Sequence, residues 1–178
     1  DDASVPKNKF LEALELMRHR GPDVPPTYLS SNQAQLGHNR LKIIDLDNRS
    51  NQPFWSGDGR YLIVFNGEIY NYQELARQYC IQQRTSCDTE VLIELYAKLG
   101  PKMLPLLNGM FAFVIWDTKN NQFFAARDRL GVKPLYIARK SGGVVIASEI
   151  APILTITGFS KFDEVGLRQY RQLRAFFN

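Results

Sequence analysis

Cysteine is scarce in this chain: Cys80 and Cys87 are the only two among 178 residues. So low a count does not suggest a disulfide framework, and we therefore expect a reducing, cytoplasmic setting. Cys80 ends a predicted helix, where a buried and inert thiol is expected.

Long apolar runs are missing as well. No run approaches the roughly 20 residues that a membrane helix needs. The polar, acidic start Asp1–Ser4 does not resemble a signal peptide. We therefore expect no membrane partner.

Charge of one sign is not concentrated either. The net charge is +4, and basic residues are scattered except for Arg168, Arg171 and Arg174. Their even spacing favours a solvated helix face over a nucleic-acid site, so no nucleic-acid partner is expected. What remains is a soluble globular composition, with 44% hydrophobic and 22% charged residues. The length suits one domain.

Hydrophobic periodicity predicts helices in the first half of the chain. Phe10, Leu11, Leu14 and Met17 recur on one face of a helix over 7–18, which ends at a Gly-Pro stop signal. The remaining pattern predicts a loop at 23–31, a strand at 35–46, polar turns at 47–58, a strand at 60–69, helices at 72–82 and from 87 or 88 to 99, and a short helix at 102–107.

Four short apolar segments follow, at 110–116, 122–126, 135–138 and 144–147, with turn residues between them. This spacing predicts an antiparallel meander, and a helical turn at 150–156 closes it. Strands at both ends of the chain, with helices gathered between them, predict the α+β class.

The stretch Phe65–Tyr70 combines structural and chemical signals. Its Asn66-Gly67 pair predicts a turn, because both residues tolerate positive φ. Asn71 is a candidate N-cap for the next helix, and Glu74 stands where a capping box needs it. Asn66 through its side-chain amide and Gly67 through its backbone N–H could hold a carbonyl that becomes an oxyanion. The alternative is a plain hairpin or strand-to-helix turn.

Seven segments, in this order, resemble the class II glutamine amidotransferases, and among them the glutaminase domain of asparagine synthetase. They are Arg18–Asp23, His38–Asp45, Phe65–Tyr72, Cys87–Val91, Leu107–Phe113, Ala126–Tyr136 and Ala147–Glu149. The resemblance implies a four-layer αββα Ntn-hydrolase sandwich with two antiparallel sheets.

The resemblance also implies a glutamine site. Arg40 matches the arginine that holds the α-carboxylate, as a planar guanidinium is suited to do. In such enzymes the backbone from Arg40 through Leu41, Lys42, Ile43 and Ile44 lines the carboxylate side of the pocket. Asn66 and Gly67 match the oxyanion pair. Arg40 could instead be an ordinary edge-strand charge, and so could Asp45.

The other end of the implied site is acidic. Glu68 belongs to the glutamine-binding segment, and Asp88 matches the carboxylate that takes the α-ammonium. The alternative for Asp88 is a helix N-cap alone. A second group, Arg127-Asp128-Arg129 with Lys133-Pro134, resembles a segment that supports the pocket and faces a partner domain. Its alternative is a charged hairpin.

The nucleophile of the resembled family is a cysteine at the mature N-terminus, and its own α-amine is the base. His19 is therefore expected to be structural. Cys87 is not expected to be the nucleophile, because its α-nitrogen is an amide and the adjacent Asp88 would raise the pKa of its thiol. The sequence opens at Asp1, so we expect the cysteine to precede it in the cellular protein. The alternative is a non-catalytic glutamine-binding or scaffold module.

The resemblance divides the sequence into an amidotransferase domain at 1–158 and a linker at 159–178 toward a synthetase domain. The implied function is hydrolysis of glutamine to glutamate and ammonia, for transfer to an acceptor carboxylate activated by ATP. No cofactor or metal is expected in this domain, since ATP and Mg²⁺ would bind the synthetase domain. Glutamine and a synthetase domain, in cis or in trans, are the expected partners, and a homodimer stays open.

Overall fold

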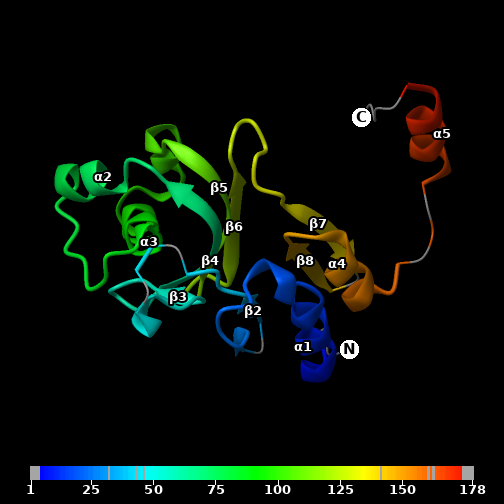
Figure 1. The fold of residues 1–178 in the computed structure, drawn as a ribbon, viewed down its shortest axis with the longest axis horizontal. Coiled ribbons are helices and arrows are strands. Elements are labelled where there is room, and N and C mark those ends of the chain that lie inside the picture. Colours follow the sequence, from blue (N-terminus) through cyan, green and yellow to red (C-terminus); the bar gives the residue numbers. More distant parts are fainter. Residues whose placement is uncertain are drawn as a thin grey trace.

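The computed structural model describes residues 5–31, 33–42, 44–45, 47–140, 142–159, 161 and 163–173. All strand pairs are antiparallel, so the class is α+β as predicted. Figure 1 shows helices α2 and α3 on one side of the largest sheet, with a smaller sheet and helices α1 and α4 on its other side. Arg174 lies outside the described residues.

The largest sheet has the strand order β3-β4-β5-β6. Its strands are β3 (Phe54–Trp55), β4 (Tyr61–Ile69), β5 (Gly109–Asp117) and β6 (Gln122–Arg127). The pairing of β4 with β5 is its longest, running from Tyr61 opposite Asp117 to Ile69 opposite Gly109. A single register over nine residue pairs fixes which β4 side chains face the helices.

The main core lies between this sheet and its helices α2 (Tyr72–Gln78) and α3 (Asp88–Leu99). Helix α3 buries Val91, Leu92, Ile93 and Leu95 and ends at Gly100, which adopts positive φ. Each fully buried aliphatic side chain contributes about 1.5–3 kcal/mol of transfer free energy. From the sheet, the core receives Ile63, Phe65, Ile69, Phe111, Phe113 and Ile115.

The rest of the molecule, which includes the first helix and the first two strands, consists of smaller units. Strands β7 (Tyr136–Lys140) and β8 (Gly143–Ala147) pair with each other and contact α4 (Ile150–Thr157), which packs on α1 (Lys7–Leu16). Strands β1 (Thr27–Ser30) and β2 (Gln35–His38) form a third sheet. The 3-10 segments are η1 (Arg18–Arg20), η2 (Asn48–Ser50) and η3 (Gly100–Leu106). Helix α5 (Glu164–Leu173) lies apart from the rest in Figure 1.

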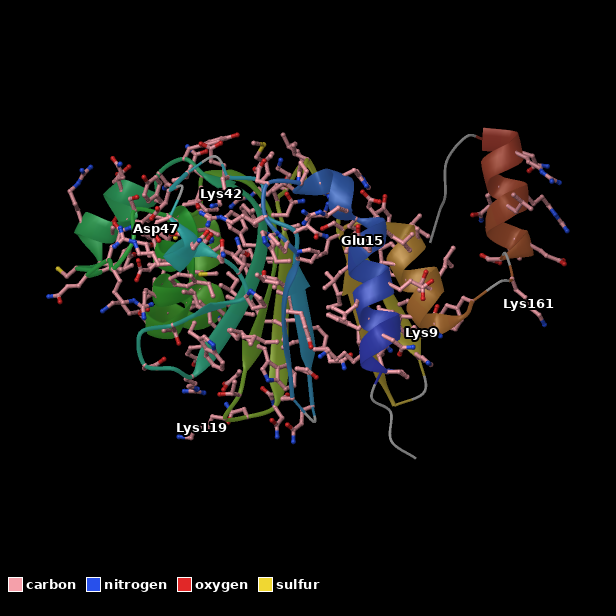
Figure 2. All side chains as sticks on the ribbon, turned by 60° about the horizontal axis from the view of Figure 1, so that its bottom comes forward. Lys9, Glu15, Lys42, Asp47, Lys119 and Lys161 are labelled. Atoms are coloured by element: carbon pink, nitrogen blue, oxygen red, sulfur yellow. The ribbon has the colours of Figure 1, made fainter. Side chains whose placement is uncertain are left out.

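Charged side chains are exposed in different parts of the molecule. Glu15, Asp47 and Lys119 are exposed, and Figure 2 marks them at three separate places. The described part of the chain holds no helix with the length and apolar character of a bilayer span.

The predicted turn at Asn66-Gly67 is wrong. Strand β4 runs through both residues, which pair with Ala112 and Phe111 of β5. Gly67 has φ 153°, a value that side chains disfavour, and a Cβ on it would overlap the Met110 carbonyl oxygen and lie 2.8 Å from the Phe111 Cα. The glycine is thus required for close approach of two strands and not for a reversal of the chain.

Four other predictions differ from the structure. The predicted meander is divided, because β6 and β7 belong to different sheets. The predicted strand at 35–46 ends at His38, and the predicted loop at 23–31 contains β1. Asn71 stands at the N-cap of α2, but its side chain makes no capping bond. It donates to the Leu106 carbonyl and accepts from the Asn108 N–H, both at 3.0 Å, which ties α2 to the start of β5.

Gly67→Ala should lower the free energy of unfolding by about 1–3 kcal/mol, because the methyl group forces β4 away from β5 and strains φ. Gly143→Ala is the matched control in another strand, since its Cβ would meet no atom within 4 Å. Urea unfolding of both variants checks this. Equal stabilities for the two variants would contradict the packing argument.

Candidate functional site

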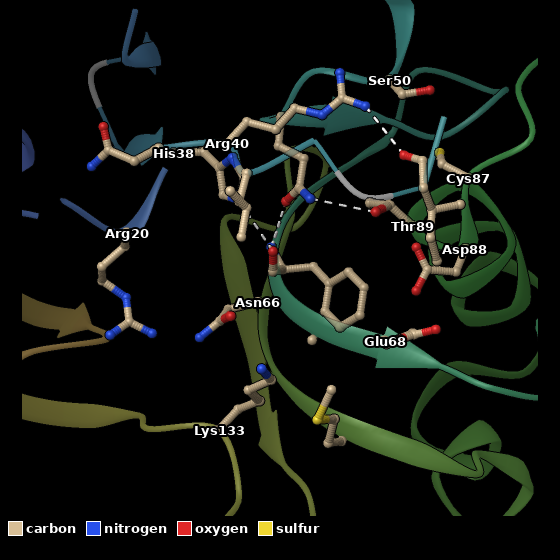
Figure 3. A pocket seen from close by; sticks show the side chains of 17 residues that line it. Arg20, His38, Arg40, Ser50, Asn66, Glu68, Cys87, Asp88, Thr89 and Lys133 are labelled. Atoms are coloured by element: carbon tan, nitrogen blue, oxygen red, sulfur yellow. Dashed lines mark hydrogen bonds between the residues drawn. The ribbon is translucent and has the colours of Figure 1, made fainter. Parts of the chain in front are cut away.

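A cavity of about 170 Å³ opens where β4 approaches the start of α3 and the segment after β2. Its lining comes from distant parts of the sequence, namely Arg20, residues 38–41, Ile44, Ser50, Gln52, residues 65–68, residues 87–89, Met110 and Lys133. In Figure 3 the carboxylates of Glu68 and Asp88 lie on one side of the cavity, and the cations of Arg20 and Lys133 lie on the other side, with Asn66 beside them.

Asn66 carries the most informative atom of the cavity. Its Nδ2 is buried and has no hydrogen-bond partner among the described residues. An unpaired buried donor costs about 1–3 kcal/mol, so such groups are rare in native proteins unless a ligand uses them. The neighbouring Gly67 also lines the cavity. The predicted oxyanion pair is therefore placed together in the cavity.

Arg40 is buried and lines the cavity, but its guanidinium is occupied. Nη1 donates to the Asp47 carbonyl and to Asn51 Oδ1, both at 2.7 Å. Nη2 donates to the carbonyls of Ile44 and Asp45. Arg40 therefore shapes the segment after β2 around itself, and a bound carboxylate would have to share or replace these bonds.

The four residues after Arg40 do not behave alike. Leu41 and Ile44 line the cavity, whereas Ile43 lies outside the described residues. The backbone N–H of Lys42 donates to Asp23 Oδ2 at 2.8 Å, and its Nζ donates to Asn48 Oδ1 at 3.0 Å. Lys42 thus joins the loop after η1 to η2.

Asp88 is the first residue of α3 and is 5% exposed. Cys87 holds the N-cap position, so the interpretation of Asp88 as only an N-cap is wrong. Asp88 Oδ2 accepts the Ile69 N–H at 3.0 Å. Burial is the main cause that raises the pKa of Asp88 to about 6, and the charge of Glu68 adds to it. A carboxylate this poorly compensated favours a bound cation.

Comparison with known proteins shows the family of this chain. The model of the glutamine amidotransferase domain matches residues 1–177. This chain belongs to the glutamine amidotransferase domain family. Asparagine synthetase B [glutamine-hydrolyzing] of Escherichia coli strain K12 is 40% identical over 158 residues, covering 87% of this chain and 28% of the relative. The asparagine synthetase [glutamine-hydrolyzing] of Asparagus officinalis is 40% identical over 152 residues, covering 84% of this chain and 25% of the relative.

A relative with a different name is also similar. Amidase chry2 of Gibberella zeae is 38% identical over 156 residues, which cover 86% of this chain and 23% of that protein. The chain therefore spans about a quarter of the length of these curated relatives. The amidotransferase domain is what they share with it.

Sequence reasoning missed the hydrogen bonds of two side chains that brace the cavity. Gln52 is buried, its Oε1 accepts the Phe65 N–H at 2.6 Å, and its Nε2 donates to Thr89 Oγ1 at 3.4 Å. His38 Nε2 donates to the Phe65 carbonyl at 3.2 Å. Burial lowers the pKa of His38 to about 4, so its ring is neutral at physiological pH. Gln52 carries no local sequence signal. His38 opens the segment His38–Asp45 that resembles the family, but nothing in the sequence indicates its bond to Phe65.

The segment 127–134 is an ordered loop built around Asp128. The Asp128 carboxylate accepts the N–H groups of Phe111, Val132 and Lys133 at 3.2, 2.9 and 3.0 Å. These bonds hold the pKa of Asp128 below its usual range, and the bond from the Lys133 N–H has the largest effect. The loop thereby presents Lys133 at the edge of the cavity.

His19 and the two cysteines take no part in the polar centre of the cavity. His19 Nε2 lies 2.8 Å from Glu149 Oε1, which also accepts from Arg20 at 3.1 Å. Cys87 lines the cavity but is buried, with its Sγ 3.0 Å from Thr85 Oγ1. Cys80 is exposed, so the expectation that it is buried is wrong. Among the described residues, no cluster of three His, Cys, Asp or Glu could hold a metal ion.

Asp88 should destabilise the free domain at neutral pH. Its pKa in the folded state, about 6, lies above the ordinary 3.8, so the folded protein keeps a proton that the unfolded chain releases between these values. Stability is therefore lost as pH rises through that window. Asp88→Asn should raise the free energy of unfolding at pH 8 by on the order of 1–3 kcal/mol and change little at pH 3.5.

Asp117→Asn provides a control of opposite sign. Asp117 pairs with Arg60 at 2.7 Å, and this hydrogen bond lowers its pKa to about 2. The ionised Asp117 therefore stabilises the fold at pH values above its ordinary pKa, so Asp117→Asn should lower the free energy of unfolding at pH 8. Chemical unfolding at both pH values checks the pair, and a less stable Asp88→Asn at pH 8 would contradict the account of Asp88.

Proposed function

We propose that this domain hydrolyses glutamine to glutamate and ammonia. The single observation that carries the proposal is the buried Asn66 Nδ2 beside Gly67, which has no partner among the described residues and lies in a cavity that also holds Arg40 and Asp88. The family match and the names of the asparagine synthetases support the same substrate.

The three polar parts of glutamine find complementary groups in the cavity. The α-ammonium pairs with Asp88, and Glu68 adds negative potential on that side. The α-carboxylate lies against Arg40 and takes over part of its hydrogen bonding. The side-chain amide then points toward Asn66 and Gly67, whose N–H groups stabilise the oxyanion.

The reaction needs a nucleophile that attacks the amide carbon. A thiolate adds to this carbon, the carbonyl oxygen becomes the oxyanion, and ammonia leaves once its nitrogen accepts a proton. Water then hydrolyses the γ-glutamyl thioester to glutamate and regenerates the thiol. We assign the thiol to an N-terminal cysteine preceding Asp1. Cys87 does not suit the role, because it is buried, internal and bonded to Thr85.

The wider context of the reaction is also a proposal. The ammonia passes to a carboxylate that ATP activates in a synthetase domain, in cis or in trans. No cofactor acts in the glutaminase domain itself.

The domain occupies 1–158 as a four-layer αββα sandwich of the Ntn-hydrolase type, and 159–178 leads toward the synthetase. A cytoplasmic setting fits this role. The layer order in Figure 1 supports the sandwich, and the family match supports the glutaminase role.

A non-catalytic glutamine-binding module is the second candidate. The cavity would then bind glutamine without a reacting thiol. Intact mass and N-terminal sequencing of the cellular protein discriminate the two, since only the enzyme carries an N-terminal cysteine before Asp1.

Asn66→Ala in the full-length protein with its N-terminal cysteine should lower kcat for glutamine hydrolysis by about 10²–10³. KM should change little, because the donor acts on the developing oxyanion and not on the ground state. Ammonia release at saturating glutamine measures this. A folded Asn66→Ala enzyme with near-normal kcat would remove Asn66 from the oxyanion site.

Glutamine affinity should depend on the ionisation of Asp88. Since the pKa of Asp88 is about 6, the Kd of glutamine should rise about tenfold for each pH unit below 6 and level off above it. Asp88→Asn should bind weakly at every pH between 4.5 and 8. Calorimetry across this range checks both proteins, and a flat profile for the unaltered protein would exclude Asp88 as the ammonium partner.

A further inference from the structure

The two groups that recognise an amino acid lie on separate walls of the cavity. Arg40 belongs to the carboxylate wall, the segment 39–52 that follows β2. Asp88 belongs to the ammonium wall, the turn 84–87 with the start of α3. The two charges of an α-amino acid are attached to one carbon atom. The spacing of these walls must therefore be fixed for both charges to be bound at once.

Each wall is held together by its own hydrogen bonds. In the carboxylate wall, four acceptors of the segment 44–51 converge on the Arg40 guanidinium. In the ammonium wall, the buried Glu90 accepts the Arg84 N–H at 3.0 Å and the Thr85 N–H at 2.8 Å. Glu90 thereby fastens the turn to α3.

Asp45 connects the two walls. Its Oδ2 accepts the Ser50 hydroxyl at 2.8 Å on the carboxylate wall and the Ser86 N–H at 2.9 Å on the ammonium wall. Its Oδ1 accepts the Asp47 N–H at 3.0 Å, and its carbonyl accepts from Arg40 Nη2. One carboxylate is thus bonded to the segment that holds Arg40 and to the turn that precedes Asp88.

The backbone and charge of Asp45 suit this connection. Its φ is 53°, a left-handed value that Asp and Asn tolerate better than other side chains. The Ser86 N–H is the main cause that holds the pKa of Asp45 well below its usual range, so the carboxylate stays ionised. A further bond between the walls, from Gln52 Nε2 to Thr89 Oγ1, is longer at 3.4 Å.

We propose that Asp45 is a positioning residue that sets the spacing of the two walls, so that the domain selects a γ-amide carrying both an α-carboxylate and an α-ammonium. This inference rests on the proposed function. Asp45 does not touch the substrate. Without the Asp45 carboxylate, Arg40 and Asp88 no longer bind the α-carboxylate and the α-ammonium of one molecule at the same time. Binding then loses the contribution of the α-ammonium, while the amide end of the pocket is unchanged.

The test compares two probes by calorimetry: L-glutamine, and glutaramic acid, which keeps the carboxylate and amide but lacks the amino group. Asp45→Asn keeps the shape and the left-handed backbone and cannot accept from all three donors. It should weaken L-glutamine binding at least tenfold and glutaramic acid binding less than threefold. Asp45→Gly is a second variant that retains the φ value and removes the carboxylate, with the same expected result.

Asp58→Asn is the matched control. It makes the same charge change at a carboxylate that also accepts a serine hydroxyl and a backbone N–H, from Ser56 at 2.6 Å and from Arg60 at 3.0 Å. Asp58 precedes β4 and lies outside both walls. It should leave both affinities within twofold. Hydrogen exchange at the Ser86 amide gives an independent measurement, and exchange should become at least tenfold faster in Asp45→Asn only.

The outcomes separate this inference from the proposed function. If the unaltered domain does not bind L-glutamine, both the proposed function and the inference are wrong. This holds even if hydrogen exchange at the Ser86 amide becomes faster in Asp45→Asn. If it binds L-glutamine and Asp45→Asn weakens both probes equally or neither, the proposed function stands and the spacing role of Asp45 is overturned. Unchanged Ser86 exchange would also overturn it.

Discussion

The close antiparallel pairing of β4 with β5 is the constraint on which the site depends. Its register sets Asn66 opposite Ala112 and Gly67 opposite Phe111, and a side chain at 67 would force the strands apart. One face of β4 supplies the core with Ile63 and Phe65, so the strand cannot shift by one residue without exchanging core and cavity positions. The proposed oxyanion donors, Asn66 and Gly67, are therefore placed by the hydrophobic core.

The site retains electrostatic costs that folding alone would remove. Asp88 is buried with its charge poorly compensated, and Asn66 Nδ2 is buried with no partner among the described residues. Each disfavours the empty fold, and in the proposed function each is satisfied by one part of glutamine. Active sites commonly sacrifice stability in this way, because a group already satisfied by the protein has little to offer a ligand. The supporting residues show the opposite pattern: Asp128 and Glu90 are saturated with donors.

The sequence predicts best where one pattern decides the structure. Helix α3 and strands β4 and β5 follow from apolar periodicity, and the similarity of whole segments brings Arg40, Asn66 and Asp88 to one site. The turn at Asn66-Gly67 fails because pairing with β5 overrides local turn propensity. The strand beyond His38 fails because Arg40 gathers four acceptors of the segment 44–51 around its side chain. The bracing bonds of Gln52 and His38 have no local signal, since their partners are distant in sequence.

The central claim is the orientation of glutamine between Asp88 and the pair Asn66 and Gly67. A crystal structure of the domain with L-glutamine tests it most directly. The account predicts the α-ammonium on the Asp88 carboxylate and the side-chain amide oxygen about 2.7–3.2 Å from both Asn66 Nδ2 and the Gly67 nitrogen. Glutamine bound in the reverse direction, with its α-carboxylate at Asn66, or bound outside this cavity, would contradict the claim.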